Sequence, residues 1–384
     1  MSGDALVQAA GVTRPSKSVR LREARFEDHP QVAALETKFE LVPKSYEEWM
    51  HLWADNPACR EMQGKFPIGW VLENADGAIV GYLGNIPVNC ELEARKLLAA
   101  TTRAWVVEES ARSYALLLLA TYFKQDNVEL FLNTSVNSES ARAYGSFQGI
   151  PVPVGAWDRS LFWITNYRGF AESFLRKKGG SMARPLSYPL SGALFLADQF
   201  RAGRFSDEMA FEVQSCAGFD DRFESFWMAL RKMKHRQLLS IRNREALEWH
   251  FKYSLLNQSA WIYTWGGSSG LAAYSIFDRQ DYHPFGLTRM RLTDFQCLDE
   301  EKAPAILNAM LKTALARCRR ESFHMLELTG LNRRLESEVE RASPHHRQLS
   351  NWRYFYKANR RDLGEKLKNA DLWDPSFYDG DSSL

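Results

Sequence analysis

The chain has 384 residues, of which 45% are hydrophobic, 13% aromatic and 25% charged. This length exceeds the size at which one hydrophobic core usually stops growing, so we expect two domains. The 49 basic and 47 acidic residues give a formal charge of +2. This balance argues against nucleic acid or an anionic membrane as the main partner, but it says nothing of local patches.

The cysteines indicate neither a disulfide framework nor a zinc site. They are odd in number, widely spread and form no CxxC pair or Cys/His cluster, which favours a reducing compartment. Their positions are Cys59, Cys90, Cys216, Cys297 and Cys318. His345 and His346 are adjacent, but no third ligand follows at a recognisable spacing, so we expect no metal.

The N-terminal segment lacks the basic and then apolar layout of a signal peptide, and the longest apolar run, residues 114–120, is far too short to span a membrane. We therefore expect a cytoplasmic protein without a membrane span. Residues 1–17 are small and polar with no period, which predicts a flexible leader.

The first domain is expected over residues 18–165. Alternating apolar residues at 19 and 21 predict a strand, and Asp28 with Pro30 predicts the start of a helix over 28–39. Asp76-Gly77 predicts a hairpin between two further strands, because both residues tolerate positive φ. A strand ending at Val107, a helix over 113–125, a strand over 128–132 and a helix over 138–147 complete a mixed sheet.

Residues 166–235 are rich in aromatic and turn residues and are interpreted as a connector. A second domain is expected over 236–360, with strands over 260–265, 271–277, 289–297, 323–331 and 352–358. Pro304 marks the start of its long helix, and residues 361–384 form an acidic tail. The fold class is therefore α/β (α+β), with two lobes, each a mixed and mostly antiparallel sheet flanked by helices.

A strand, a polar corner and a helix follow one another over residues 106–115. The first amides of a helix, helped by its dipole, are suited to binding phosphates. This element resembles the pyrophosphate-binding turn of the GNAT acyltransferase superfamily, with Arg112 at the Arg/Gln position and Ala115 at the first small position. The turn departs from the family in having no glycine and in having Leu117 where Gly or Ala is usual. The resemblance implies a CoA site at Val106, Val107, Arg112, Ser113, Tyr114, Ala115 and Asn137.

The following strand and helix resemble the closing motif of the same superfamily. Asn137, Ser140 and Tyr144 fall at the matching spacing, whereas Gly149 arrives one residue late and Ile150 replaces the usual Phe. In the family this tyrosine often protonates the departing CoA thiolate, and a pKa of about 10 suits that role. The resemblance thus implies Tyr144 as general acid; the alternative is an aromatic ring that packs the helix on the sheet.

The second lobe has the same layout but lacks the phosphate turn, because acidic residues and Pro304 stand in residues 297–304. Paired lobes of this kind resemble the double-GNAT proteins, including the FemAB-like aminoacyl transferases. Asp294, within an apolar strand, is either a buried base for an amine or a carboxylate with a structural partner. Arg112 is either a phosphate ligand or a solvated residue at a helix start.

The resemblance implies an acyl-CoA-dependent N-acyltransferase, with acetyl-CoA or a longer acyl-CoA as cosubstrate and no metal. Its acceptor would be a small-molecule primary amine, such as an amino sugar, an amino acid or an envelope precursor. Two alternatives stay open: a non-catalytic GNAT-like scaffold, and an aminoacyl-tRNA-dependent transferase. The neutral charge balance counts against nucleic acid. The sequence leaves the acceptor, the acyl length and the oligomeric state undetermined.

Overall fold

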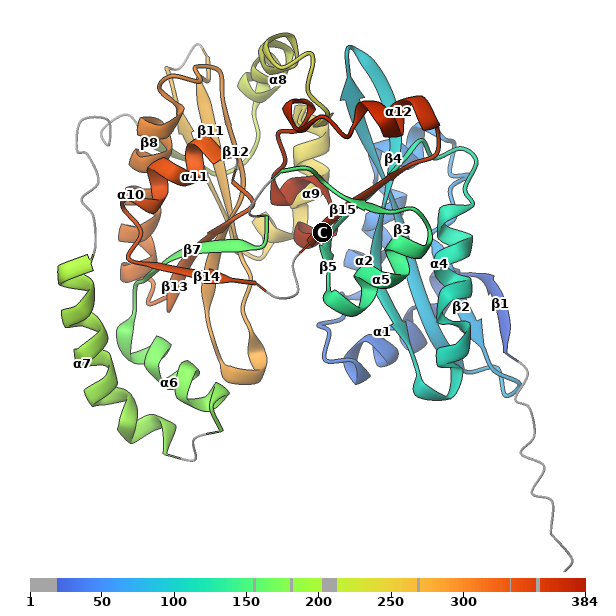
Figure 1. The fold of residues 1–384 in the computed structure, drawn as a ribbon, viewed down its shortest axis with the longest axis horizontal. Helices are drawn as coiled ribbons and strands as arrows, with labels where there is room; N and C mark the ends of the chain where they lie inside the picture. The colour runs from blue at the N-terminus through green and yellow to red at the C-terminus, as the bar shows by residue number, and fades with distance from the viewer. Residues whose placement is uncertain are drawn as a thin grey trace, which may run out of the picture.

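A computed structural model of the protein describes residues 19–154, 157–179, 182–201, 213–267, 270–331, 333–349 and 353–384. These residues form two sheets, each flanked by helices, that lie side by side (Figure 1). Within the described residues, one pair of neighbouring strands in each sheet is parallel and the other pairs are antiparallel. The expected pair of mixed, mostly antiparallel sheets is confirmed.

The first lobe is built on an eight-stranded sheet within the described chain. Its strands are β1 (Arg20–Glu23), β2 (Gly69–Glu73), β3 (Ile79–Leu92), β4 (Arg95–Val107), β5 (Leu130–Val136), β6 (Ile150–Pro151), β9 (Leu239–Ser240) and β15 (Arg353–Ala358). They run in the order β1-β2-β3-β4-β5-β15-β6, and β9 pairs with β3. The helices are η1 (Phe26–Asp28), α1 (His29–Lys38), α2 (Tyr46–Ala54), α3 (Pro57–Glu61), η2 (Glu109–Tyr114), α4 (Ala115–Phe123) and α5 (Ser138–Ser146).

The second lobe is built on a seven-stranded sheet within the described chain. Its strands are β7 (Arg159–Ile164), β8 (Val213–Cys216), β10 (Ala260–Trp265), β11 (Ala273–Arg279), β12 (Arg289–Cys297), β13 (Met325–Thr329) and β14 (His345–Gln348). They run in the order β14-β7-β13-β12-β11-β10-β8. The helices are α6 (Tyr167–Lys177), α7 (Ala183–Arg201), α8 (Asp221–Met233), α9 (Arg244–Leu256), η4 (His283–Phe285), α10 (Ala303–Arg320) and α11 (Arg333–Glu340).

The long helix α10 shows why these residues form these elements. Pro304 stands in its first turn, where the missing N–H costs nothing, and three basic residues in its last turn complement the helix dipole. Its apolar residues recur at helical spacing and are buried against the second sheet. Leu307 and Leu311, one turn apart, are both fully buried.

Three strands lie in the lobe opposite to the one expected from their position in the sequence. The short strand β9 falls within the expected second domain but pairs with β3 of the first sheet. β15 was expected within the second domain, but it pairs with β5 and β6 of the first sheet. β7 was expected within the first domain, but it pairs with β13 and β14 of the second sheet. The apolar alternation of a strand reveals that it is a strand but not its partner. Each lobe is therefore completed by a strand from the other half of the chain.

The segments expected to be a connector and an acidic tail contain helices, and the connector also contains a strand. The connector over 166–235 contains α6, α7, α8 and the strand β8, which pairs with β10. The expected tail over 361–384 forms α12 (Arg361–Lys366), η5 (Ala370–Leu372), η6 (Phe377–Asp379) and η7 (Asp381–Ser383), and its aromatic residues Trp373, Phe377 and Tyr378 are buried. The leader over 1–17 lies outside the described residues.

Candidate functional site

The centre of the first sheet opens where β4 and β5 separate. These parallel strands pair only at Ala99 with Leu130 and at Ala100 with Phe131, after which β5 continues on its other edge with β15. Beyond that point the side chain of Asn133 stands between the strands: its Oδ1 accepts hydrogen bonds from the Thr102 amide, at 3.1 Å, and from the Thr102 hydroxyl, at 2.6 Å. Asn133 thus fixes the place where the strands diverge.

β4 has a β-bulge at this opening. Ala104 and Trp105 together oppose Leu83 of β3, so the register shifts by one residue. Ala104 has a φ of 53°, in the left-handed region that a non-glycine residue rarely adopts. Bulges of this kind bend a strand and turn its backbone groups away from the ladder. Here the bulge places main-chain groups of β4 at the opening between the strands.

A cavity of about 450 Å³ fills this opening, within the range of small-molecule sites. Its walls come from β4, β5, the start of α5, and the segment after α1 that includes Leu41 and Val42. Val106, Asn137 and Tyr144, three of the residues predicted from the sequence, line it. The structure therefore brings part of the predicted site together around one cavity.

Tyr144 is buried at the wall of this cavity, with 3% of its surface exposed. Its hydroxyl lies 3.3 Å from the Thr102 hydroxyl. Its ring makes edge contacts with Trp105, Phe123 and Phe355. Burial raises the pKa of Tyr144 well above its ordinary value, so the hydroxyl keeps its proton at neutral pH. Both sequence interpretations, packing and proton donation, are compatible with this position.

Asn137 combines a local structural contact with a place at the cavity. Its Oδ1 accepts a hydrogen bond of 2.7 Å from the Ser140 amide, which caps the N-terminus of α5. The same residue lines the cavity wall. The spacing of Asn137 and Ser140 in the sequence thus has a capping role in addition to any role in binding.

The predicted phosphate turn has a different local structure from the one expected. The 3-10 helix η2 stands between β4 and α4, and the Ala115 amide donates to the Arg112 carbonyl. The Ala111 amide likewise donates to the Glu108 carbonyl. Among the predicted residues, Val107 is buried, Arg112 and Ser113 are exposed, and Tyr114 and Ala115 are half-buried. The Ala115 amide is therefore already paired within the protein.

A second cavity, of about 610 Å³, adjoins this turn. It is lined by Lys38, Phe39, Glu108, Glu109, Ser110 and Arg112. The Lys38 ammonium lies 2.7 Å from the Glu108 carboxylate. Phe39 also lines the cavity between β4 and β5, so the two cavities are neighbours. The cavity at the predicted phosphate turn is thus lined by both cationic and anionic side chains.

Two charged residues at the first cavity were not predicted from the sequence. Arg103 lines the wall, and its Nη2 lies 3.7 Å from a carboxylate oxygen of Glu36. Burial raises the pKa of Glu36, and its Oε1 has no hydrogen-bond partner among the described residues. Asp381 also lines the wall and accepts hydrogen bonds from the amide and hydroxyl of Thr134, at 2.9 and 2.8 Å.

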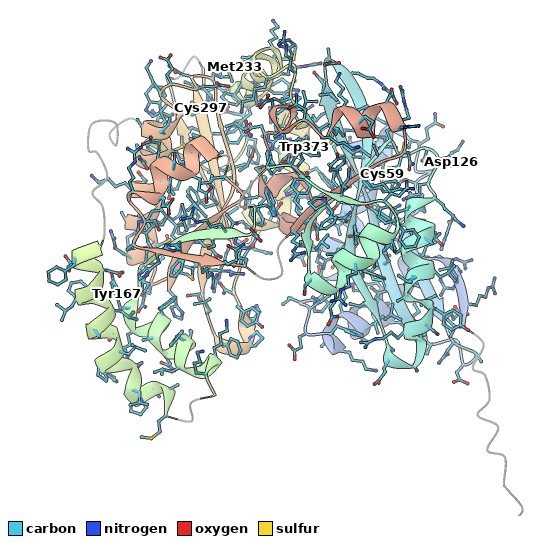
Figure 2. All side chains as sticks on the ribbon, viewed as in Figure 1. Cys59, Asp126, Tyr167, Met233, Cys297 and Trp373 are labelled. Atoms are coloured by element: carbon cyan, nitrogen blue, oxygen red, sulfur yellow. The ribbon has the colours of Figure 1, made fainter. Side chains whose placement is uncertain are left out.

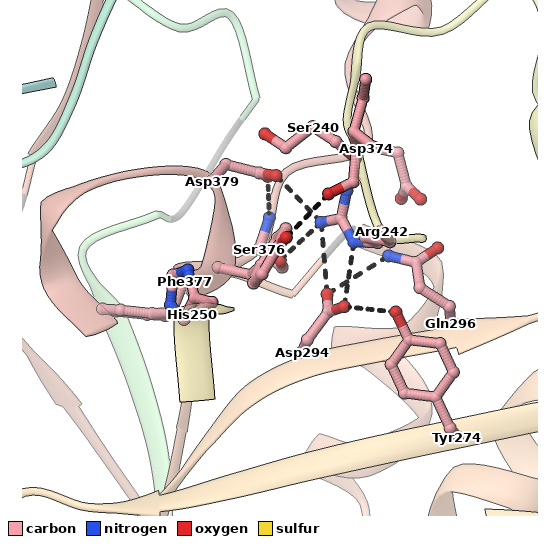
Figure 3. A network of polar contacts seen from close by, with 12 residues as sticks. Ser240, Arg242, His250, Tyr274, Asp294, Gln296, Asp374, Ser376, Phe377 and Asp379 are labelled. Atoms are coloured by element: carbon pink, nitrogen blue, oxygen red, sulfur yellow. Dashed lines mark hydrogen bonds and ion pairs between the residues drawn. The ribbon is translucent and has the colours of Figure 1, made fainter. Parts of the chain in front are cut away.

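Asp294 lies elsewhere, within a buried polar network between the lobes (Figure 3). Its carboxylate receives the Arg242 Nε at 2.9 Å and the Tyr274 hydroxyl at 2.7 Å, and both members of the ion pair are fully buried. Burial alone would raise the pKa of Asp294, but the Arg242 guanidinium holds it below its usual range. These contacts support the structural interpretation of Asp294 and not the interpretation as a base at the acyl-transfer cavity.

Within the described chain, no group of three or more His, Cys, Asp or Glu residues is placed to hold a metal ion. His345, one of the adjacent histidines, pairs instead with Asp198 at 2.8 Å. In that part of the chain no helix is both long and apolar enough to cross a membrane.

No protein-family model and no curated protein matches this sequence. Among solved structures, the chain is similar to the N-myristoyltransferase of Saccharomyces cerevisiae with bound myristoyl-CoA, at 12% identity and a TM-score of 0.56 over 89% of this chain and 80% of that one. It is also similar to a GCN5-related N-acetyltransferase from Anabaena variabilis, at 12% identity and a TM-score of 0.51 over 89% of this chain and 73% of that one. The chain has the double-GNAT fold. At these identities the likeness concerns the fold alone.

Proposed function

We propose that this protein is an N-acyltransferase that transfers the acyl group of acetyl-CoA or a longer acyl-CoA to a primary amine. The observation that carries the proposal is the cavity where β4 and β5 separate, which the bulge residue Ala104 lines. The fold supports it, because the yeast protein with the same two-lobed fold was solved with bound myristoyl-CoA.

Two neighbouring cavities support this proposal, one for the thioester arm of CoA and one for its phosphates. The thioester arm of CoA is an extended chain with two amides, and the facing edges of β4 and β5 carry main-chain groups that such a chain can pair with. The neighbouring cavity, where Lys38 and Arg112 stand, accommodates the phosphates. Arg112 and Lys38 would supply charge-assisted hydrogen bonds to the pyrophosphate.

The reaction needs a base, an oxyanion site and an acid. The Asp381 carboxylate at the cavity wall accepts a proton from the attacking amine, which forms a C–N bond to the thioester carbonyl. A backbone N–H next to the bulge at Ala104 stabilises the tetrahedral oxyanion. The C–S bond then breaks, and the Tyr144 hydroxyl gives its proton to the thiolate. The products are an amide and CoA.

One observation favours a second candidate function, a non-catalytic scaffold. Glu108 and Glu109 line the cavity expected to receive phosphates, and negative charge there opposes their binding. A scaffold would keep the fold and bind no CoA thioester.

Isothermal titration of the protein with acetyl-CoA and longer acyl-CoAs separates the two. We expect saturable binding by at least one thioester, weakened by about 1.5 kcal/mol in Arg112→Ala, the lower end for hydrogen bonds to charged groups. Arg320→Ala is the matched control, because its side chain is 72% exposed at the end of α10 in the other lobe. A folded protein that binds none of the thioesters would establish the scaffold instead.

Tyr144→Phe tests the chemical step. Because the hydroxyl is needed only when the thiolate forms, we expect acyl-CoA affinity to be unchanged and turnover to fall by about 10²-fold or more. Release of free thiol, with a panel of primary amines as acceptors, measures turnover. Unchanged turnover in Tyr144→Phe would leave this tyrosine with a packing role only.

A further inference from the structure

The helical hairpin α6–α7 projects from the edge of the second lobe (Figure 1). The inner face of α7 is fixed to the protein: Ser187 and Asp198 are almost fully buried. Asp198 accepts a hydrogen bond of 3.0 Å from the Tyr167 hydroxyl of α6 and pairs with His345 of β14 at 2.8 Å. These contacts determine which face of α7 turns outward.

The outward face of α7 is apolar. Met182, just before the helix, and Leu186, Leu196 and Phe200 within it expose 59%, 48%, 60% and 89% of their surface. At about 100° per residue, these four positions fall within an arc of about 80°. Side chains of α7 project away from the body of the protein, beyond the labelled Tyr167 (Figure 2). Monomeric proteins rarely expose large apolar residues in such a continuous stripe.

The hairpin is also the site of a local positive charge. Residues 166–201 contain six basic and two acidic residues, a net charge of +4 against +2 for the whole chain. Of the two acidic residues, Asp198 is buried and Glu172 pairs with Arg176. Lys177, Lys178 and Arg184 are exposed close to the apolar stripe in the sequence. No exposed carboxylate of the described hairpin is left to balance them.

An exposed apolar stripe within a cationic segment is the pattern of a helix that lies in the interface of an anionic bilayer. We propose that α7 docks this protein on anionic lipid membranes, with the stripe inserted among the headgroups. Burial of Leu196 and Phe200 supplies the apolar part of the affinity, and the lysines that end α6 supply attraction to the lipid headgroups. A partner protein or a second copy would need no such positive charge. The proposal does not depend on acyl transfer.

Flotation of the full-length protein with vesicles tests the proposal. The probes are vesicles of phosphatidylcholine alone and vesicles with about 30% phosphatidylserine. We expect binding to the anionic vesicles only, and weaker binding at high salt. Phe200→Glu and Leu196→Glu should each weaken binding at least about tenfold, since each removes a large apolar side chain that enters the bilayer when the protein binds.

Charge reversal and a matched control complete the design. Lys177→Glu with Lys178→Glu should weaken binding by at least about 25-fold, from about fivefold for each basic residue lost near an anionic surface, because the two added carboxylates are also repelled. Leu256→Glu is the control, because Leu256 is 67% exposed at the end of α9, away from the hairpin, and should bind like the unaltered protein. Circular dichroism verifies that each variant is folded.

The proposal is overturned by any of three results. The first is no binding to anionic vesicles, and the second is equal binding by Phe200→Glu and Leu256→Glu. The third is self-association in sedimentation velocity without vesicles that Phe200→Glu abolishes, which would make the stripe an interface between two copies.

Discussion

Arg242 is a fully buried guanidinium whose charge is balanced by two carboxylates. Asp294 of β12 and Asp379 of η6 both lie 2.9 Å from it, so it connects the second sheet to the C-terminal segment. The ring of Tyr378 covers the guanidinium at 4.7 Å. A charge removed from water this completely is tolerated only when it is paired and hydrogen-bonded.

Asp294→Asn removes one of the two negative charges that balance the Arg242 guanidinium. Because breaking a buried ion pair costs about 3–5 kcal/mol and Asp379 remains, we expect the free energy of unfolding to fall by about 3 kcal/mol. Urea denaturation measures the change. Asp221→Asn is the control, because the Asp221 side chain is 95% exposed in its pair with Arg244 and should change stability by less than about 1 kcal/mol.

If Asp294 were the base for the amine, Asp294→Asn would instead abolish turnover without a comparable loss of stability. That outcome would restore the catalytic interpretation and contradict the structural one. The sequence left both open for a physical reason: Arg242 stands 52 residues before Asp294, and no local pattern joins them.

The C-terminal elements η6 and η7 depend on one close approach. A Cβ added to Gly380 would lie 2.6 Å from the Thr134 Cγ2 and 2.7 Å from its Oγ1. The φ of Gly380 is extended, so space and not backbone strain requires glycine here. Because Gly380 fits against Thr134, the next residue, Asp381, reaches the Thr134 amide and hydroxyl.

Gly380→Val should displace η7 from β5 and take Asp381 away from the cavity. Overpacking of this kind costs about 1–3 kcal/mol, and we expect a stability loss in that range together with a fall in acyl-transfer turnover. Urea denaturation and thiol release measure the two effects. Gly218→Val is the control, because nothing lies within 4 Å of a Cβ at Gly218. Full turnover in Gly380→Val would show that Asp381 has no part in the chemistry.

At the scale of elements, the sequence predicted those with strong local signals. The helix that contains α10 and the hairpin turn at Asp76-Gly77 have such signals, from helical spacing and turn chemistry. α2 and α3 were not predicted, although both have N-caps: the Ser45 side chain accepts a hydrogen bond from the Glu48 amide, and the Asn56 side chain accepts one from the Ala58 amide. The sequence indicated a possible helix over 191–205 but not its start at Ala183, because Pro189 lies inside α7.

The candidate site was predicted only in part. Asn137 and Tyr144 belong to one local motif and Val106 to another, and the order of these motifs along the chain was enough to predict these three residues, which line one cavity. Arg103 lines the cavity next to the bulge at Ala104, and no pattern in the sequence predicts that bulge. Asp381 lies 247 residues from Thr134, and its position depends on the whole fold.

At the scale of the molecule, the exchange of β7 and β15 joins the two lobes. β15 supplies the strand between β5 and β6, and β7 supplies the strand between β13 and β14. Neither sheet is complete without a strand from the other half of the chain. The buried network around Arg242 adds a polar connection between the same parts.

We therefore expect one cooperative unfolding transition, although chains with two lobes often unfold in two. Leu311→Ala in α10 and Leu118→Ala in α4 each remove a fully buried side chain, one in each lobe, at a cost of about 2–5 kcal/mol. Because each sheet contains a strand from the other half of the chain, each variant should shift the whole denaturation curve without splitting it. Tryptophan fluorescence and far-ultraviolet circular dichroism should give coincident curves in urea. The opposite result is a Leu311→Ala curve with two transitions, one at the midpoint of the unaltered protein and one at lower urea. It would mean that the first lobe stays folded after the second sheet has unfolded. The strand exchange would then not couple the lobes.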